Sequence, residues 1–187
     1  MDRAGRALLP LVKQVLTTRA GAKRLGGNAI GLGTWQNRVI ESNGSEIKVT
    51  AMPAHHGSLG SHLIVGETTG FLFEWEGQKR GALYISGDTV WFNGIHEIAQ
   101  RFKVSTAILH IGKAGFPLTG PIRFTFNASD AVRAIHSLKP QKVIPIHYEG
   151  WIHFREPKAE AEKVFTEAGM NELVQWLPLG KPADVAI

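Results

Sequence analysis

Three polar segments carry side chains that can bind a metal ion, and each follows an apolar run typical of a β-strand. They are residues 53–57 with His55 and His56, residues 86–89 with Asp88, and residues 145–151 with His147. Imidazole nitrogens and carboxylate oxygens suit zinc, manganese or iron. A metal ion held there would lower the pKa of a bound water toward ~7 and polarise a carbonyl or phosphoryl oxygen. The pattern therefore predicts metal-assisted hydrolysis.

Each segment also has a simpler interpretation. Adjacent histidines on extended backbone point to opposite sides, so at most one of His55 and His56 is expected to face a site. Asp88 or Thr89 is also placed to cap a helix that begins near Trp91. A single histidine such as His147 is more often structural than a ligand. A metal site is favoured because all three segments lie just past the ends of predicted strands, which is where catalytic and binding residues of α/β folds are usually found.

Hydrophobic periodicity predicts the elements that position these segments. Strands are expected at residues 13–18, 38–41, 47–52, 63–65, 71–75, 82–86, 106–109, 142–146 and 173–177. Asn43-Gly44 is a strong hairpin signal, and Pro145 predicts that its strand is at an edge or is ending. Residues 19–33 form a polar, glycine-broken stretch without a predicted element.

Helices are predicted in the second half of the chain. Apolar residues recur at helical spacing over 95–102 and over 128–138, where Asn127 is a good N-cap with Asp130 three residues later. Pro157 suits the first turn of a third helix that ends before Gly169. A β-rich half followed by alternating strands and helices predicts a layered α/β fold. At 187 residues, one domain over 1–187 is expected.

Composition narrows the class of protein. Without cysteine, a metal must be held by His, Asp or Glu. The chain has neither an apolar run of the ~20 residues that cross a bilayer nor a signal-peptide pattern, so a cytoplasmic location is expected. The formal charge of +5 includes basic residues near the N-terminus. They are interpreted as a solvated face, because no nucleic-acid-binding motif accompanies them.

The three segments together resemble a known family. Pro-Ala-His-His-Gly at 53–57, Ser-Gly-Asp-Thr at 86–89 and Pro-Ile-His-Tyr-Glu-Gly-Trp at 145–151 are similar to the later motifs of the metallo-β-lactamase superfamily. More closely they resemble its ascorbate-phosphate-lactonase-like branch, which is itself similar to N-acylphosphatidylethanolamine phospholipase D. The resemblance covers essentially the whole chain and implies an αββα sandwich with a metal centre, usually of two ions, at the edge of the sheets.

The resemblance also implies roles for individual residues. His56, with His55 as second choice, would bind the first metal, His147 would bind the second, and Asp88 would bridge them, so Asp88 and His147 form the catalytic pair. The cofactor would be a divalent metal, zinc first, with manganese or iron as alternatives. His153 and Trp151 would lie on the substrate side. The remaining histidines are interpreted as structural: His62, His96, His110 and His136.

The family's opening motif, His-x-His-x-Asp-His, has no counterpart in this chain. In the family it precedes a helix that residues 2–9 resemble, so an N-terminally truncated sandwich is expected, either a fragment or a shortened protein. The complete protein would use a metal-activated water to attack a lactone, ester, amide or phosphoester in a small-molecule substrate, and this chain alone would be weakly active. The alternative is a non-catalytic protein that binds a partner, or forms a homo-oligomer, through an exposed sheet.

Overall fold

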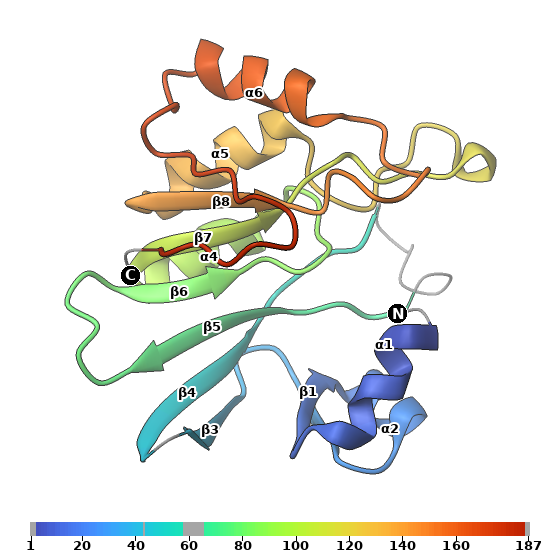
Figure 1. Cartoon of the computed structure of the whole chain (residues 1–187), viewed down its shortest axis with the longest axis vertical. Helices are drawn as coiled ribbons and strands as arrows, with labels where there is room; N and C mark the ends of the chain where they lie inside the picture. The colour runs from blue at the N-terminus through green and yellow to red at the C-terminus, as the bar shows by residue number, and fades with distance from the viewer. Residues whose placement is uncertain (1–2, 43, 58–65, 186–187) are drawn as a thin grey trace.

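A six-stranded sheet forms the centre of the computed structural model, which describes residues 3–42, 44–57 and 66–185 (Figure 1). Its order is β3-β4-β5-β6-β7-β8. The strands are β3 (Asn37–Ser42), β4 (Ser45–Met52), β5 (Gly70–Trp75), β6 (Ala82–Ile85), β7 (Val104–His110) and β8 (Lys142–Ile146).

Strand directions bring four carboxyl ends to one edge of this sheet. β3 to β6 pair antiparallel, whereas β6, β7 and β8 pair parallel. β4 therefore runs in the same direction as β6, and the chain leaves β4, β6, β7 and β8 on the same side. The three predicted polar segments follow three of these strands.

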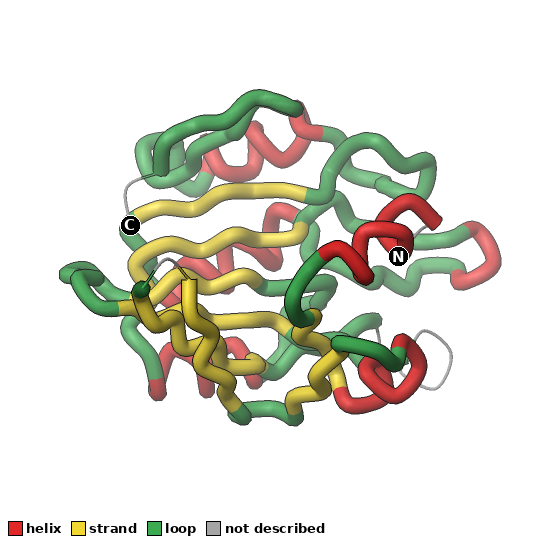
Figure 2. Tube along the Cα trace, turned by 60° about the horizontal axis from the view of Figure 1, so that its bottom comes forward, coloured by secondary structure: helices red, strands yellow, loops and turns green. Residues whose placement is uncertain are grey.

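Helices cover one face of the sheet (Figure 2). They are α4 (Gly94–Arg101), α5 (Ala128–Leu138) and α6 (Lys158–Glu167). Leu72 and Tyr84 point into the core beneath them and are fully buried. Phe71 and Phe73, on the opposite face, are only half-buried. The alternation follows from the two-residue period of a strand.

The N-terminal segment forms a small lobe beside the sheet, with α1 (Arg3–Leu8), η1 (Leu9–Leu11), β1 (Val15–Thr18), α2 (Arg19–Leu25) and β2 (Ala29–Leu32). β1 and β2 pair parallel, and α2 packs on both (Figure 1). The interpretation of residues 19–33 as lacking an element was wrong. Thr18 caps α2 by accepting from Gly21 N at 3.0 Å, and Gly31 lets β2 approach Arg19, because a Cβ there would meet the Arg19 Cα at 2.7 Å.

Most other predicted elements are confirmed. α5 and β8 have the predicted bounds, Asn127 Oδ1 accepts from Asp130 N at 2.8 Å, and β8 ends the strand order as Pro145 predicted. Pro157 is the N-cap of α6 rather than a residue of its first turn. The strand predicted at 173–177 was wrong, because the described chain there forms only a single bridge, Val174 to Val143.

The strand predicted at 63–65 and the residue Asn43 lie outside the described residues. No helix in the described part of the chain is long and apolar enough to cross a membrane. A short 3-10 turn, η2 (Pro117–Thr119), lies in the loop between β7 and α5.

Candidate metal centre

Asp88 and His147 lie beside each other at the common carboxyl edge. Asp88 follows β6 and His147 follows β8, and Asp88 Oδ1 is 3.7 Å from His147 Nε2. That separation is too long for a hydrogen bond. Two donors of one tetrahedral zinc ion, each at ~2.0–2.1 Å from the metal, lie ~3.3–3.4 Å apart. The pair is therefore spaced nearly as two ligands of one ion.

Within the described part of the chain, no hydrogen bond fixes either nitrogen of the His147 ring. Its Nδ1 is buried and has no hydrogen-bond partner among the described residues, and its Nε2 faces Asp88 beyond hydrogen-bond reach. A buried polar atom without a partner costs ~1–3 kcal/mol, so such atoms in a fold need an explanation. An imidazole that binds a metal would supply one.

The backbone of His147 is held in an unusual conformation. Its φ of 63° lies in the left-handed region, which costs a non-glycine residue ~1–2 kcal/mol. Gly112, with φ 93°, supports it from the loop after β7. A Cβ at Gly112 would meet the His147 carbonyl oxygen at 2.4 Å, so only glycine allows this approach.

His55 and His56 contact different aromatic rings, as expected for adjacent residues on extended backbone. The His55 ring lies edge-on to Phe92 with centroids 5.6 Å apart, and the His56 ring lies edge-on to Phe124 at 5.3 Å. Burial lowers the pKa of His56, the Asp88 carboxylate opposes that shift, and His147 adds to it. His56 therefore lies within electrostatic range of the Asp88–His147 pair.

Asp88 does not cap a helix. α4 begins at Gly94 with Asn93 before it, so the alternative interpretation of Asp88 and its neighbour as an N-cap was wrong. Thr89 Oγ1 instead accepts from His55 N at 2.8 Å. This bond ties the segment after β6 to the segment after β4.

His110 belongs to the same group of side chains, although it was interpreted as structural. It is the last residue of β7, and its ring centroid is 5.5 Å from that of His147. Burial lowers its pKa to about 4, opposed by Asp88 and reinforced by His147. The signal for it was present in the sequence, because His110 directly follows the predicted strand 106–109, as the other site residues follow theirs.

Aromatic side chains lead from His147 to the surface. Phe154 lies edge-on to His147, with centroids 4.5 Å apart, and next to His153 at 4.8 Å. His153 in turn contacts Trp151 at 5.8 Å and Phe116 at 5.1 Å. Trp151 is 57% exposed. The two predicted substrate-side residues, His153 and Trp151, thus lie at the outer end of a chain of rings that begins at His147.

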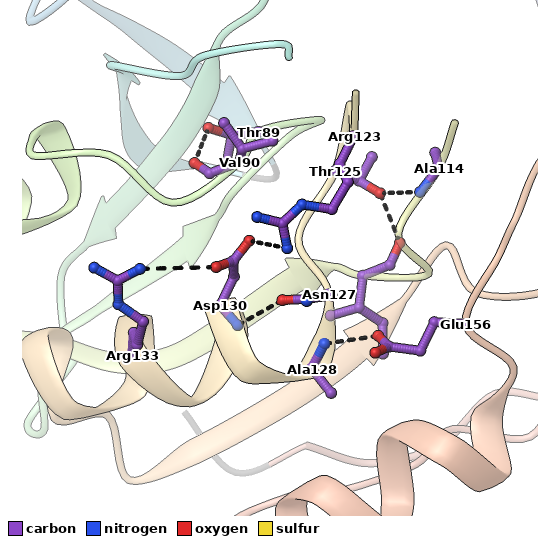
Figure 3. A network of polar contacts seen from close by, with 11 residues as sticks. Thr89, Val90, Ala114, Arg123, Thr125, Asn127, Ala128, Asp130, Arg133 and Glu156 are labelled. Carbon is purple, nitrogen blue, oxygen red and sulfur yellow. Dashed lines mark hydrogen bonds and ion pairs between the residues drawn. The ribbon is translucent and has the colours of Figure 1, made fainter. Parts of the chain in front are cut away.

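Two loops anchored to each other support this side of the site. The carbonyl of Gly112 accepts from Arg155 N at 3.0 Å and from Glu156 N at 3.2 Å. The Glu156 side chain accepts from Ala128 N, at the start of α5, at 2.6 Å (Figure 3). Thr125 Oγ1 accepts from Ala114 N and donates to Ile111 O. These bonds fix the loop that carries Gly112, and through it the backbone of His147.

A pocket of about 430 Å³ lies beside His55 and His56, and neither Asp88 nor His147 lines it. Its other walls come from the N-terminal lobe and from residues 66–69, including Thr18, Arg19 and Thr34. Across the described residues, no three His, Asp or Glu side chains converge closely enough to hold a metal ion. The Asp88–His147 pair fits a metal, but two ligands do not complete a site.

Two further histidines lie on helices, away from the Asp88–His147 pair. His96 is exposed on α4 with its ring against Trp91 at 5.2 Å, and His136 is exposed on α5. His62 lies outside the described residues.

The chain has a metallo-β-lactamase-type α/β fold. Its features are a sheet with parallel and antiparallel strands, helices on one face of that sheet and polar residues at its carboxyl edge. The family model described as "Beta-lactamase superfamily domain" matches residues 8–148, and the chain belongs to this family.

Curated relatives support the same placement. A UPF0173 metal-dependent hydrolase of Nanoarchaeum equitans is 32% identical over 131 residues, which cover 68% of this chain and 55% of that protein. One from Desulforamulus reducens is 35% identical and covers 70% of this chain and 54% of its own length. The chain therefore spans about half the length of the curated relatives that it matches.

Solved structures share the fold. A possible metal-dependent hydrolase from Veillonella parvula superposes with a TM-score of 0.78 at 18% identity, covering 96% of this chain and 70% of that one. The isothiocyanate hydrolase from Delia radicum gut bacteria superposes with a TM-score of 0.75 at 21% identity, with the same coverages.

Proposed function

We propose that the complete protein is a metal-dependent hydrolase whose metal centre includes Asp88 and His147. The observation that carries the proposal is this pair, 3.7 Å apart at a common strand edge, with an imidazole that the described residues leave without a hydrogen bond. The curated relatives are named metal-dependent hydrolases, which supports the same class. When bound, the metal would activate water and polarise the oxygen of the bond to be cleaved.

Individual roles follow the positions of the side chains. Asp88 supplies a carboxylate that can bridge, His147 an imidazole held by its left-handed backbone, and His56 a second imidazole within range of both. His153 and Trp151 contact the substrate side. Zinc is the metal we propose first, because these nitrogen and oxygen donors suit it, with manganese and iron as alternatives.

The substrate class is a small molecule with a lactone, ester, amide or phosphoester bond. Its support is the chemistry that a metal-activated water performs. The resemblance to the ascorbate-phosphate-lactonase-like branch stays a prediction, as do a single domain over residues 1–187 and a cytoplasmic location. Because the described residues supply no three convergent ligands, we expect weak turnover from this chain alone.

Metal content tests the proposal directly. The purified chain, dialysed without strong chelator, is compared by plasma mass spectrometry with Asp88→Ala, His147→Ala and the control Asp184→Ala, which changes an exposed carboxylate. We expect near-stoichiometric zinc, manganese or iron in the wild type and in the control, and its loss in the two site variants. A wild type without metal, or an Asp88→Ala variant that keeps it, would contradict the assignment. Loaded protein is then screened with lactone and phosphodiester substrates.

The half-buried sheet face favours a second function, binding of a partner. Phe71 pairs with Ile85 and Phe73 with Leu83, so these four apolar side chains lie together on the face opposite the helices. An apolar face of this kind favours association. Light scattering after size exclusion would show a dimer or larger species that Phe73→Glu converts to monomer, whereas a wild type that is monomeric at high concentration would exclude self-association through this face.

A further inference from the structure

The Ser86 hydroxyl contacts both the backbone and the ring of His110. Its Oγ donates to the Gly87 carbonyl at 2.8 Å. Because a serine hydroxyl has one proton, it can only accept in its other contacts. These are the His110 backbone N at 2.9 Å and the His110 Nδ1 at 3.3 Å.

One tautomer of His110 satisfies all three contacts of the Ser86 hydroxyl at once. An acceptor beside Nδ1 requires the proton on Nδ1, which leaves the lone pair of Nε2 available. Metal-binding histidines generally donate their other ring N–H in this way, and the partner fixes both tautomer and ring orientation. Ser86 is fully buried and directly precedes the Gly87-Asp88 turn, so the same hydroxyl links His110 to the segment that carries Asp88.

The position of His110 agrees with a role at the Asp88–His147 pair. Two imidazoles bound to one tetrahedral zinc ion place their ring centroids roughly 5 Å apart, given metal–nitrogen bonds of ~2.0–2.1 Å. The His110 and His147 centroids are 5.5 Å apart, with their planes inclined by 48°. In the described chain no three donors converge on one point, so binding requires the three side chains to close around the ion.

We propose that His110 is a further ligand of the metal centre and binds through Nε2 while Ser86 holds Nδ1. The inference rests on the proposed function, because it places His110 at the same ion as Asp88 and His147. His110 supplies the third donor that the Asp88–His147 pair needs for a site of catalytic type, in which three protein ligands leave a position open.

Cobalt binding by the full chain provides the test. Co²⁺ is titrated into the wild type, His110→Gln, Asp88→Ala and the control His136→Gln, which replaces an exposed imidazole on α5. The readouts are the dissociation constant and the visible ligand-field spectrum, which responds to the number of nitrogen ligands. We expect His110→Gln to weaken binding ~10-fold or more and to change the spectrum, while His136→Gln matches the wild type.

Nitrogen NMR of the wild type supplies a second readout that does not depend on the folding of a variant. We expect the Nδ1-protonated tautomer of His110 in chelator and a large shift of its Nε2 resonance on addition of Zn²⁺. An unmoved Nε2 resonance overturns the assignment.

The variants separate the two proposals. Equal cobalt affinity in the wild type and His110→Gln, with loss in Asp88→Ala, would overturn the role of His110 and leave the hydrolase proposal intact. A wild type that binds no cobalt would overturn both.

Discussion

The Glu156 side chain accepts a hydrogen bond from a backbone amide at the N-terminus of α5, although it lies far from α5 in sequence. Its replacement by alanine should destabilise both the helix and the loop that carries His147. Glu156 Oε2 accepts from Ala128 N at 2.6 Å, and both residues are buried. Asn127 caps a different amide, that of Asp130 (Figure 3). The two side chains therefore satisfy separate N–H groups of the first turn.

The magnitude follows from three losses in Glu156→Ala. The Ala128 N–H is left buried without a partner, which costs ~1–3 kcal/mol. The carboxylate no longer interacts with the helix dipole, worth ~0.3–1 kcal/mol. One buried methylene is removed, worth ~0.8 kcal/mol. Because the ionised carboxylate is itself costly to bury, we expect a net decrease of about 2–3 kcal/mol in the free energy of unfolding.

Glu156→Gln separates the hydrogen bond from the charge. Burial raises the pKa of Glu156 above 4.5, partly offset by its bond to Ala128 and by Lys113. A pKa raised by folding means that the ionised form of Glu156 opposes folding. The stabilising contribution of the protonated form is therefore fully present below pH 4.5 and is lost as the pH rises through the folded-state pKa. The neutral glutamine keeps an acceptor, and we expect it to lie within ~1 kcal/mol of the wild type.

Urea unfolding followed by circular dichroism measures these differences, with the exposed Glu172→Gln as control. On acidification toward pH 4 the wild type should gain stability relative to Glu156→Gln. A Glu156→Ala variant within 0.5 kcal/mol of wild type (about the scatter of surface substitutions), or a Glu156→Gln variant as unstable as the alanine variant, would refute the role given to this hydrogen bond.

Three further predictions concern the loop, the tyrosines and an ion pair. Gly112→Ala should cost about 2–4 kcal/mol and weaken metal binding, because its Cβ would meet the His147 carbonyl oxygen at 2.4 Å. Burial raises the pKa of Tyr84, and it raises the pKa of Tyr148 to about 12. Native protein should therefore show no phenolate absorbance near pH 10, and stability should be lost as the pH rises through the folded-state values. Arg123→Ala should cost about 2 kcal/mol, because it removes the ion pair at 3.1 Å from the Asp130 carboxylate, whose side chain is 7% exposed.

Each of these has a matched comparison. Gly120→Ala, at φ 58° with open space around it, should cost only ~1 kcal/mol, and equal effects at positions 112 and 120 would refute the close approach to His147. Urea-unfolded chain should titrate both tyrosines near pH 10, and native protein that does the same would show them exposed. Arg133→Ala, 4.0 Å from Asp130 and 59% exposed, should cost under ~1 kcal/mol.

Local patterns in the sequence were sufficient for the elements whose burial is one-sided. The apolar stripe of residues 128–138 and its Asn127 cap define α5 without reference to the rest of the fold. β8 was recognised from a different signal, the short continuous apolar run before His147, and its edge position agrees with Pro145. Because chain direction alternates predictably between strands and helices, the sequence also indicated that Asp88 and His147 follow strand ends.

Long-range contacts decided the rest. The strand at residues 13–18 was predicted, but α2 and β2 were not, because their short segments have too weak a periodicity to be recognised without the β1–β2 pairing that places them. The segment at residues 173–177 is apolar enough to predict a strand, but in the fold only Val174 pairs with β8, through one bridge to Val143. The pairing of β7 with β8 places His110 beside His147, and the loop after β8 places Glu156 at the start of α5. Neither contact could be predicted, because the local sequence around a residue does not indicate which distant residue it will contact.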